Sequence, residues 1–468
     1  MENLNKIIGD INSVLYFPIL VILLIAVGLY FTVRTGFIQV SLLKESFRVI
    51  KEKPDDESDV SSFQALMIST ASRVGTGNIV GVSSAICLGG YGAVFWMWLV
   101  AIIGAGSAFA ESTLAQIYKK KGEKGSYGGP SYYIEQGLKS KKLGLVFSVA
   151  LIVCYAVGFN MLASYNLQQS FKSYSIYDPN LTPKILGGLF ALAVALVILG
   201  GGKRIIKITQ KLVPFMGIIF VLVSLIMIGL NLTRLPEVFR KIFEDAFNFK
   251  AIFSGLAGSS MVLGMKRGLY SNEAGIGSAP NAAAAAKVSH PVKQGLVQML
   301  SVFIDTLIIC SATAFMGLSS GIEPSPALDG SPFIQEALAS VFGNFGYYFI
   351  TVSLILFGFT TLIGNLYYVD SNFDYIVGKE LTEKQRLPYR LIAVFLIFFG
   401  AIQEQGFVWN LSDLFMGIMA LINLPAILVL SNKLIACLND YEAQRKRGED
   451  PVFVAKNIGI KEDLDYWK

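Results

Sequence analysis

Histidine is almost absent from the sequence, and this scarcity excludes several kinds of catalytic and metal site. His290 is the only histidine, and it precedes Pro291 at a predicted helix start. No convincing Ser/His/Asp arrangement surrounds it, and a site built from three histidines is excluded. We therefore expect His290 to have a structural role near a membrane interface, and we do not expect the chain to be an enzyme.

Cysteine is scarce as well, and its spacing is not that of a metal site or a disulfide framework. The four cysteines lie in apolar surroundings and form no CxxC pair: Cys87, Cys154, Cys310 and Cys437. Buried free thiols are therefore expected. The sequence also lacks GxGxxG and the lysine of a Walker loop, which argues against nucleotide binding. No organic cofactor is expected.

Charge is the third scarce property. Only 15% of the residues are charged, whereas a soluble domain would carry about 25%. Hydrophobic residues reach 53%, and the mean hydropathy is +0.56. The sequence therefore predicts an all-α integral membrane protein. Runs of about 20 apolar residues predict eleven transmembrane helices, near residues 11–33, 62–88, 93–118, 143–170, 183–199, 208–230, 248–280, 291–318, 345–369, 389–402 and 411–430.

The basic residues, which give a formal net charge of +6, lie in short connections between the apolar runs. Residues in such connections set topology, so they do not indicate a nucleic acid partner. Alternate connections are rich in lysine and arginine, whereas residues 319–343 and 403–413 contain neither. This pattern predicts an amino terminus outside and a carboxyl terminus in the cytoplasm, in a prokaryotic plasma membrane. The basic run 119–124 is expected to face anionic lipids of the inner leaflet.

One apolar run, residues 62–88, contains Gly75-Thr76-Gly77-Asn78 in its middle. Each glycine weakens a helix by about 1 kcal/mol relative to alanine. Freed backbone groups inside hydrocarbon must find partners in protein, ion or ligand. Exposed amides favour a carboxylate, and carbonyls with hydroxyls favour a small hard cation. Close helix packing through Gly77 and Gly81 is the structural alternative.

A second interrupted helix is predicted at residues 248–280. These 33 residues would extend roughly 50 Å as one helix, which exceeds a hydrocarbon core of about 30 Å. Six glycines can interrupt it: Gly255, Gly258, Gly264, Gly268, Gly275 and Gly277. Paired interrupted helices in opposed halves indicate a secondary transporter. We therefore predict a single membrane domain with an extra amino-terminal helix (11–33), two inverted repeats (62–230 and 248–430) and a cytoplasmic tail (431–468).

Four stretches resemble the alanine or glycine:cation symporter family: GTGNIVGVSSAI (75–86), GGYGAVFWMW (89–98), RGLYSNEAGIGSAP (267–280) and HPVKQGLVQMLSVFIDTLIICSATAF (290–315). The resemblance implies a LeuT-type fold with broken core helices one and six. It also implies uptake of a small neutral amino acid with sodium, by alternating access, in a protein expected to be monomeric. A proton-coupled transporter or exchanger on the same fold is the first alternative, and an ion channel the second.

The resemblance also implies roles for individual residues. The substrate would contact Thr76, Gly77, Asn78, Gln168 and Asn272. Sodium would bind between the first broken helix and the eighth core helix, at the hydroxyls of Thr360 and Thr361 and the carbonyl oxygens of Ala71 and Val74. Threonines in membrane helices commonly bond back to their own helix instead, and this alternative stays open for both.

The stretch TTLIGNLYYVD (360–370) departs from the family at Asn365, where many members carry tryptophan. Loss of an indole should enlarge the pocket and add an amide to it. We therefore expect Asn365 to contact the substrate and to admit a larger or more polar amino acid, such as glutamine or serine.

Charges within apolar spans are expensive and point to functional roles. Arg73, Glu111 and Asp305 are therefore candidates for gating or coupling. The structural alternative is a buried ion pair that fixes helix positions. We expect such pairing for Arg73 and for Glu111, and the sequence leaves open which acid meets which base. For Asp305, a proton or cation role and a helix-packing hydrogen bond are equally open.

Overall fold

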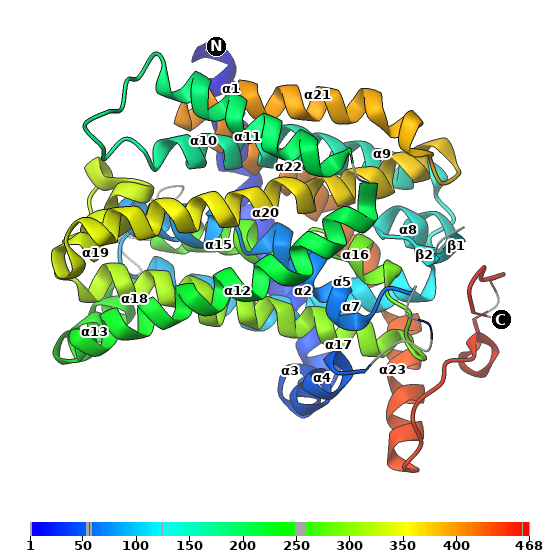
Figure 1. Cartoon of the computed structure of the whole chain (residues 1–468). Helices are drawn as coiled ribbons and strands as arrows, with labels where there is room; N and C mark the ends of the chain where they lie inside the picture. The colour runs from blue at the N-terminus through cyan, green and yellow to red at the C-terminus, as the bar shows by residue number, and fades with distance from the viewer. Residues whose placement is uncertain are drawn as a thin grey trace.

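The computed structural model describes residues 2–52, 56, 59–122, 125–199, 201–248, 259–460 and 462–467. Long helices run side by side and make up most of the molecule (Figure 1). The described residues depart from the predicted all-α structure in a short antiparallel hairpin of β1 (Lys120–Gly122) and β2 (Gly125–Tyr127), and in an isolated bridge between Val60 and Ala286. The four cysteines are buried and free, as expected.

Seven helical segments of the described chain are long and apolar enough to cross a membrane. They comprise α1 (Glu2–Val14) with η1 (Leu15–Leu20) and α2 (Val21–Arg34), α7 (Ala93–Ile117), α9 (Lys141–Ile152) with η3 (Val153–Phe159) and α10 (Asn160–Gln169), α12 (Gly201–Leu230), α17 (Pro291–Val302) with η6 (Phe303–Cys310) and α18 (Ser311–Ser319), α20 (Asn344–Val377), and α22 (Gln405–Val429). Helices α11 (Thr182–Ile198) and α21 (Glu383–Ala401) lie at two more predicted spans. The count of eleven stays a prediction.

Shorter helices connect these segments or cover their ends: α3 (Ile38–Ser41), α4 (Leu43–Ile50), α8 (Pro130–Gly137), α13 (Leu235–Ala246), α19 (Ser331–Phe342), α23 (Ser431–Lys446), and the 3-10 turns η4 (Leu232–Arg234), η7 (Pro326–Leu328) and η8 (Ala455–Ile458). Figure 1 shows α13 and α19 at one end of the bundle, and the hairpin and α8 at the other. We call these the α19 end and the hairpin end.

The eighth core helix is longer than predicted because ion pairs hold its polar end in helical form. The apolar run ends near residue 369, but α20 continues to Val377. Arg390 pairs with Asp370 at 2.5 Å, and Arg386 pairs with Asp374 at 2.7 Å. Both arginines come from α21, so the ends of the two helices stabilise each other.

The predicted break in the first core helix is present. Helix α5 (Ser62–Arg73) ends at Val74, whose ψ of 84° is not helical. The chain winds again through the π-helical turn η2 (Gly77–Gly81) and continues as α6 (Val82–Gly89). The interruption lies at Val74 and Gly75, at the start of the predicted glycine-rich motif.

The second break lies at residues 273–279. Helix α15 (Ser260–Asn272) ends where Glu273 adopts a left-handed conformation with φ of 54°. Gly275 and Gly277 follow with φ of 90° and 85°, which glycine adopts without steric cost. The chain winds again in α16 (Pro280–Ala285). Gly255 and Gly258, and the predicted start of this helix, lie outside the described residues.

The carboxyl-terminal tail packs against the hairpin end instead of lying free. The indole Nε1 of Trp467 donates to the carbonyl of Gln116 at 2.7 Å. The ammonium of Lys119 lies 3.8 Å from the ring centroid of Tyr466 and donates to the carbonyl of Ala286 at 2.9 Å. Burial lowers the pKa of Lys119 well below its usual value. The prediction that the basic run 119–124 faces lipid is therefore wrong for Lys119, because the aromatic tail covers it.

Candidate substrate and ion site

Asn78 connects the first break to the seventh core helix. Its Oδ1 accepts the amide N–H of Gly75 at 2.8 Å, so it supplies a partner for a backbone group that the break sets free. Its Nδ2 donates to Oδ1 of Asp305 at 2.7 Å. Because Asn78 and Asp305 are both fully buried, this contact fixes the break against η6 in a place closed to solvent.

Asp305 also reaches the second broken helix. Ser271, near the end of α15, donates to Oδ2 of Asp305 at 2.8 Å, and Thr306 donates to the same oxygen at 2.9 Å. We call Asn78, Ser271, Asp305 and Thr306 the Asp305 cluster. It gathers a carboxylate, two hydroxyls and an amide, whose oxygens are ligands that a hard cation prefers. The π-helical turn at η6 is of a kind that recurs at functional sites.

Glu111 occupies the second break and makes no ion pair within 4.0 Å among the described residues, so the structural ion pair expected for it is not present. Its carboxylate accepts the amide N–H groups of Gly275 at 3.3 Å and Gly277 at 3.1 Å, and Nδ2 of Asn423 at 2.7 Å. Successive amides in a turn form a concavity that binds an anion without a cationic partner. The positive φ of both glycines turns their amides toward Glu111.

Arg73 makes no ion pair within 4.0 Å among the described residues, although its side chain is 1% exposed. One guanidinium nitrogen lies 3.4 Å from the backbone and side-chain oxygens of Gln298. Arg73 is therefore not one half of a close ion pair in the described part of the chain.

Ser72 connects both breaks to the helices around them. Its hydroxyl lies 2.9 Å from Oε1 of Glu273 and 2.7 Å from Oδ1 of Asn365, and can donate to one of them at a time. Nδ2 of Asn365 donates to Oδ1 of Asn160 in α10 at 2.9 Å. The amide of Asn365, which replaces an expected indole, thus joins α20 to α5 and α10.

The two threonines of α20 point in different directions. The hydroxyl of Thr361 donates to the carbonyl of Ser72 at 3.4 Å, and a Cβ added at Gly75 would overlap this hydroxyl. The hydroxyl of Thr360 instead bonds back to the carbonyls of Leu356 and Phe357 in its own helix, at 3.1 and 2.9 Å. The structure therefore brings Thr361 to the first break and leaves Thr360 away from it.

Ala71 and Val74, whose carbonyl oxygens were the other expected sodium ligands, are fully buried on the same stretch of chain as Ser72. A Cβ added at Gly364 in α20 would lie 3.3 Å from the carbonyl carbon of Ala71, so α20 passes very close to the end of α5. Of the carbonyls at the end of α5, the one that contacts Thr361 among the described residues is that of Ser72.

Several of the expected substrate residues also lie at the breaks. The hydroxyl of Thr76 accepts Nδ2 of Asn166 at 3.1 Å. A Cβ at Gly77 would lie 2.8 Å from the ring of Tyr270 in α15, so only glycine allows this approach of the two broken helices. Asn272 accepts the amide of Ala274 at 3.0 Å through Oδ1, and its Nδ2 has no hydrogen-bond partner in the described part of the chain.

Gln168 is not brought to the first break. Its Oε1 accepts the hydroxyl of Tyr177 at 2.9 Å, in the connection that follows α10. Asn166, two residues earlier, makes the contact with Thr76 instead. In the sequence, Gln168 and Asn166 are both polar residues at the end of an apolar run. This polarity indicates a possible contact but does not show which of the two side chains faces the break.

Buried polar atoms without a partner gather in this region. In the part of the chain that the structure describes, they include Nδ2 of Asn160, Oδ1 of Asn166, Nδ2 of Asn272 and Nε of Arg73. Buried polar groups are nearly always hydrogen-bonded, and each exception calls for a reason. A polar or charged ligand between the two breaks would supply these partners.

His290 lies outside this region and is structural in its contacts. Its Nδ1 accepts the amide of Val292 at 3.2 Å and so caps α17. Its Nε2 lies 3.3 Å from Oδ2 of Asp440. Burial lowers the pKa of His290 to about 4, in spite of Asp440, so the imidazole is neutral at pH 7.

The sequence matches a known family and several known proteins. A family model described as "Sodium:alanine symporter family" matches residues 1–455. The chain is 42% identical over 467 residues to "Probable sodium/glutamine symporter GlnT" of Bacillus subtilis (strain 168), covering 99% of this chain and 96% of that one. It is also 42% identical over 479 residues to "Putative sodium/proton-dependent alanine carrier protein YrbD" of the same organism, covering 98% and 97%.

A solved structure shares the fold. "Crystal structure of MhsT in complex with L-phenylalanine" aligns with a TM-score of 0.56 at 14% identity, and the alignment covers 78% of this chain and 89% of that one. At this identity the likeness concerns the fold alone. It confirms the predicted LeuT-type membrane fold.

Proposed function

The chain belongs to the sodium:alanine symporter family, and from this premise we propose that it imports a small neutral amino acid together with sodium by alternating access. It is a multi-pass membrane transporter and not an enzyme. One observation carries the proposal: both helix breaks converge on buried polar groups, through the Asp305 cluster on one side and Ser72 on the other.

Sodium is held against the first break from α20. Thr361 supplies a hydroxyl, and the carbonyl oxygens of Ser72, Ala71 and Val74 supply the main-chain ligands. The Asp305 cluster supplies a second set of oxygens on the other side of the break, and it is the natural place for a further cation or a proton. The name of the relative YrbD, which mentions both sodium and protons, favours this second possibility as an alternative coupling.

The substrate carboxylate binds the free amides of the first break. The amide of Gly75 is already bonded to Asn78, so those of Thr76 and Gly77 remain for the carboxylate. Asn272 and Asn166 offer unpartnered polar atoms for the rest of the head group. Sodium stabilises the unwound segment and so creates the substrate site, a coupling of roughly 1–3 kcal/mol.

In this proposal, alternating access arises when the two predicted inverted repeats, residues 62–230 and 248–430, rock about the central site. The hairpin end carries the lysine-rich connections, including Lys120 and Lys121. It is the cytoplasmic end by the positive-inside rule, and the carboxyl terminus lies there.

The sodium assignment predicts a difference between two neighbouring threonines. Thr361→Val removes the hydroxyl at the break while keeping the side chain's shape. The sodium concentration for half-maximal uptake should therefore rise about tenfold. This rise corresponds to a loss of roughly 1.4 kcal/mol, which is the size of one hydrogen bond. Thr360→Val removes a hydroxyl that bonds within its own helix, and should change this concentration less than about twofold. Sodium titrations of uptake by both variants in liposomes measure this. Equal shifts would contradict the assignment.

The substrate is an amino acid of the alanine and glycine class, with glutamine as the second candidate. The relative GlnT, named for glutamine, favours the larger substrate. In this chain Asn365 stands where many members carry tryptophan. Asn365→Trp should lower the affinity for glutamine about tenfold relative to alanine, because an indole would take space beside Ser72 and Asn160.

Competition by glutamine and alanine against labelled alanine measures this ratio. Val292→Ile, at a buried site in α17 away from both breaks, serves as a control for a core volume change. An unchanged ratio in Asn365→Trp would show that position 365 does not set substrate size.

The proposal as a whole is tested by equilibrium binding. Purified protein in detergent should bind labelled alanine or glutamine in sodium chloride, and at least tenfold more weakly when choline replaces sodium. Binding that is the same in both salts would contradict sodium coupling, and no binding of any neutral amino acid would contradict the substrate class.

A further inference from the structure

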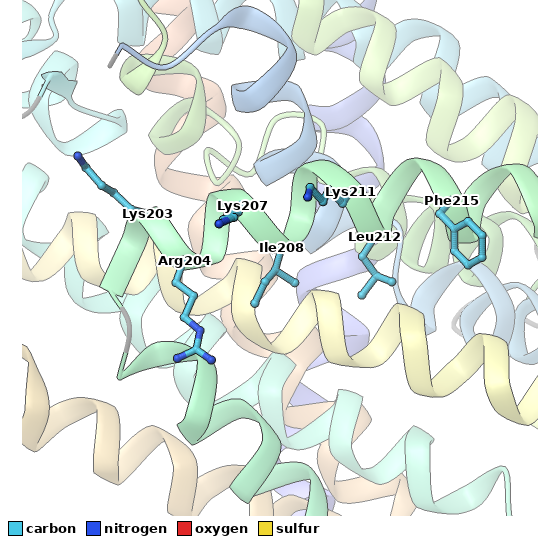
Figure 2. Close-up of a pocket in the computed structure, with 7 residues that line it drawn as sticks. All are labelled: Lys203, Arg204, Lys207, Ile208, Lys211, Leu212 and Phe215. Carbon is cyan, nitrogen blue, oxygen red and sulfur yellow. The ribbon is translucent and has the colours of Figure 1, made fainter. Parts of the chain in front are cut away.

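A basic groove runs along the exposed face of α12, outside the transport site (Figure 2). Its volume is about 840 Å³. Among the described residues, seven side chains of α12 line it: Lys203, Arg204, Lys207, Ile208, Lys211, Leu212 and Phe215. Lys203, Lys207 and Lys211 follow one another at i, i+4 and i+8, so they share one side of the helix. Arg204 and the apolar members lie directly beside this row.

The four cations of the groove have no acidic partner within 4.0 Å in the described part of the chain, whereas many other basic side chains of the protein do. All four are exposed. Like charges four residues apart on a helix repel each other, so the row disfavours the bare helix. An anion bound along it would remove that repulsion.

The groove is apolar toward the middle of the span. Phe215 is 59% exposed, and Ile218 and Leu222 on the same face are 60% and 53% exposed. The face therefore presents positive charge at the hairpin end of α12 and a continuous apolar strip beyond it. A molecule with an anionic head and a hydrocarbon chain would be complementary to this face, with its head at the basic end and its chain along the apolar strip.

We propose that this groove is a binding site for an anionic phospholipid. The lipid phosphate lies among Lys203, Lys207 and Lys211, and an acyl chain follows Leu212 and Phe215 along α12. Basic pockets on membrane helices bind acidic lipid headgroups in this way. A free phosphate would meet the same cations but would leave the apolar half of the groove unused.

The bound lipid acts on a helix that contacts the first broken segment. Gln210, in the same stretch of α12, accepts Nε2 of Gln64 in the first turn of α5 at 3.1 Å. A lipid that holds α12 in place therefore steadies the start of α5. The site is independent of the transport proposal, because it needs neither sodium nor substrate.

The test counts lipids on the purified full-length protein by native mass spectrometry, with phosphatidylglycerol and phosphatidylcholine as probes. The wild-type protein should retain phosphatidylglycerol at a concentration where phosphatidylcholine is lost. Replacing Lys203, Lys207 and Lys211 by glutamine should weaken phosphatidylglycerol binding roughly 100-fold, since each such lysine contributes roughly a factor of five. The matched control replaces Lys139, Lys141 and Lys142 by glutamine, the same charge change at exposed positions just before and at the start of α9, and should weaken phosphatidylglycerol binding less than threefold.

A further arm adds inorganic phosphate to the lipid-bound wild-type protein, and phosphate at millimolar concentration should not displace the lipid. Lys207→Gln alone, with an expected fivefold loss, provides the measurement if the triple variant does not fold. Equal binding by the triple variant and the control, equal retention of phosphatidylcholine, or displacement by phosphate alone would each overturn the proposal.

Discussion

Asp305→Asn is expected to reduce sodium-driven amino acid uptake at least 100-fold. The variant keeps the shape of the side chain but removes its negative charge. It also replaces one carboxylate oxygen, which accepts hydrogen bonds, by an amide nitrogen, which cannot accept them. Asp305 accepts hydrogen bonds from Asn78, Ser271 and Thr306, so it connects both broken helices to η6. Hydrogen bonds to a charged group contribute about 1.5–3 kcal/mol each, and a factor of 100 corresponds to the loss of about one of them. Initial uptake rates in liposomes measure the effect.

The control for Asp305→Asn is Thr313→Ala in the same transmembrane segment. Thr313 is fully buried in α18, and its hydroxyl only bonds back to the carbonyl of Ile309 at 3.4 Å. Its removal should leave uptake within about twofold of wild type. If Asp305→Asn transported as well as Thr313→Ala, the Asp305 cluster would have no part in coupling or substrate binding.

Gly75→Ala is the second substitution with a large expected effect. The new Cβ would overlap the hydroxyl of Thr361 and lie 3.1 Å from its Cβ, so α5 and α20 would have to separate. Over-packing a tight core contact costs about 1–3 kcal/mol, and here the displaced groups are the proposed sodium ligands. We expect uptake to fall at least 100-fold, while the protein remains folded in detergent.

Gly188→Ala is the matched control, because nothing lies within 4 Å of a Cβ added there. This exposed position in α11 should accept alanine with unchanged uptake and unchanged or slightly higher thermal stability. The double variant Gly75→Ala/Thr361→Ala removes the overlapping hydroxyl, so it should regain part of the stability but not the sodium affinity. Full transport by Gly75→Ala alone would show that the close approach of α5 and α20 is unimportant.

The position of the first break was predictable from the sequence because it depends on local backbone chemistry. Glycines in an apolar span, at Gly75 and Gly77, weaken a helix wherever it packs. For the second break the sequence offered six glycines, and two of them, Gly264 and Gly268, lie inside the unbroken helix α15. Gly275 and Gly277 adopt positive φ in the second break. The membrane fold followed from the length of the apolar runs and from the four family-like stretches.

The partners of the buried charges were not predictable, because they depend on which segments the fold brings together. The sequence left the partner of Glu111 open, and the ion pair expected for it is absent from the described residues because two backbone amides of the second break, 164 and 166 residues away along the chain, bind its carboxylate. The sequence around Ser271 does not indicate that it contacts Asp305. The approach of α15 to η6 brings Ser271 to the carboxylate that Thr306 also contacts.

Surface assignments were limited in the same way. Lys119 belongs to a basic run, and its covering by Tyr466 and Trp467 depends on the folded position of the tail. Gln168 and Asn166 are equally polar in sequence, and the geometry of α10 decides that Asn166 contacts Thr76. Hydropathy predicts where a helix crosses the membrane, but not the direction in which each polar side chain points.

The most direct test of the central claim uses purified protein in sealed liposomes. Labelled alanine and glutamine are offered under an inward sodium gradient, and separately under an inward proton gradient without sodium. If the two helix breaks hold solute and sodium together, at least one of these amino acids should accumulate inside the liposomes above its equilibrium concentration under the sodium gradient. Asp305→Asn should abolish this accumulation. Accumulation driven by protons alone, or no accumulation under either gradient, would contradict the account.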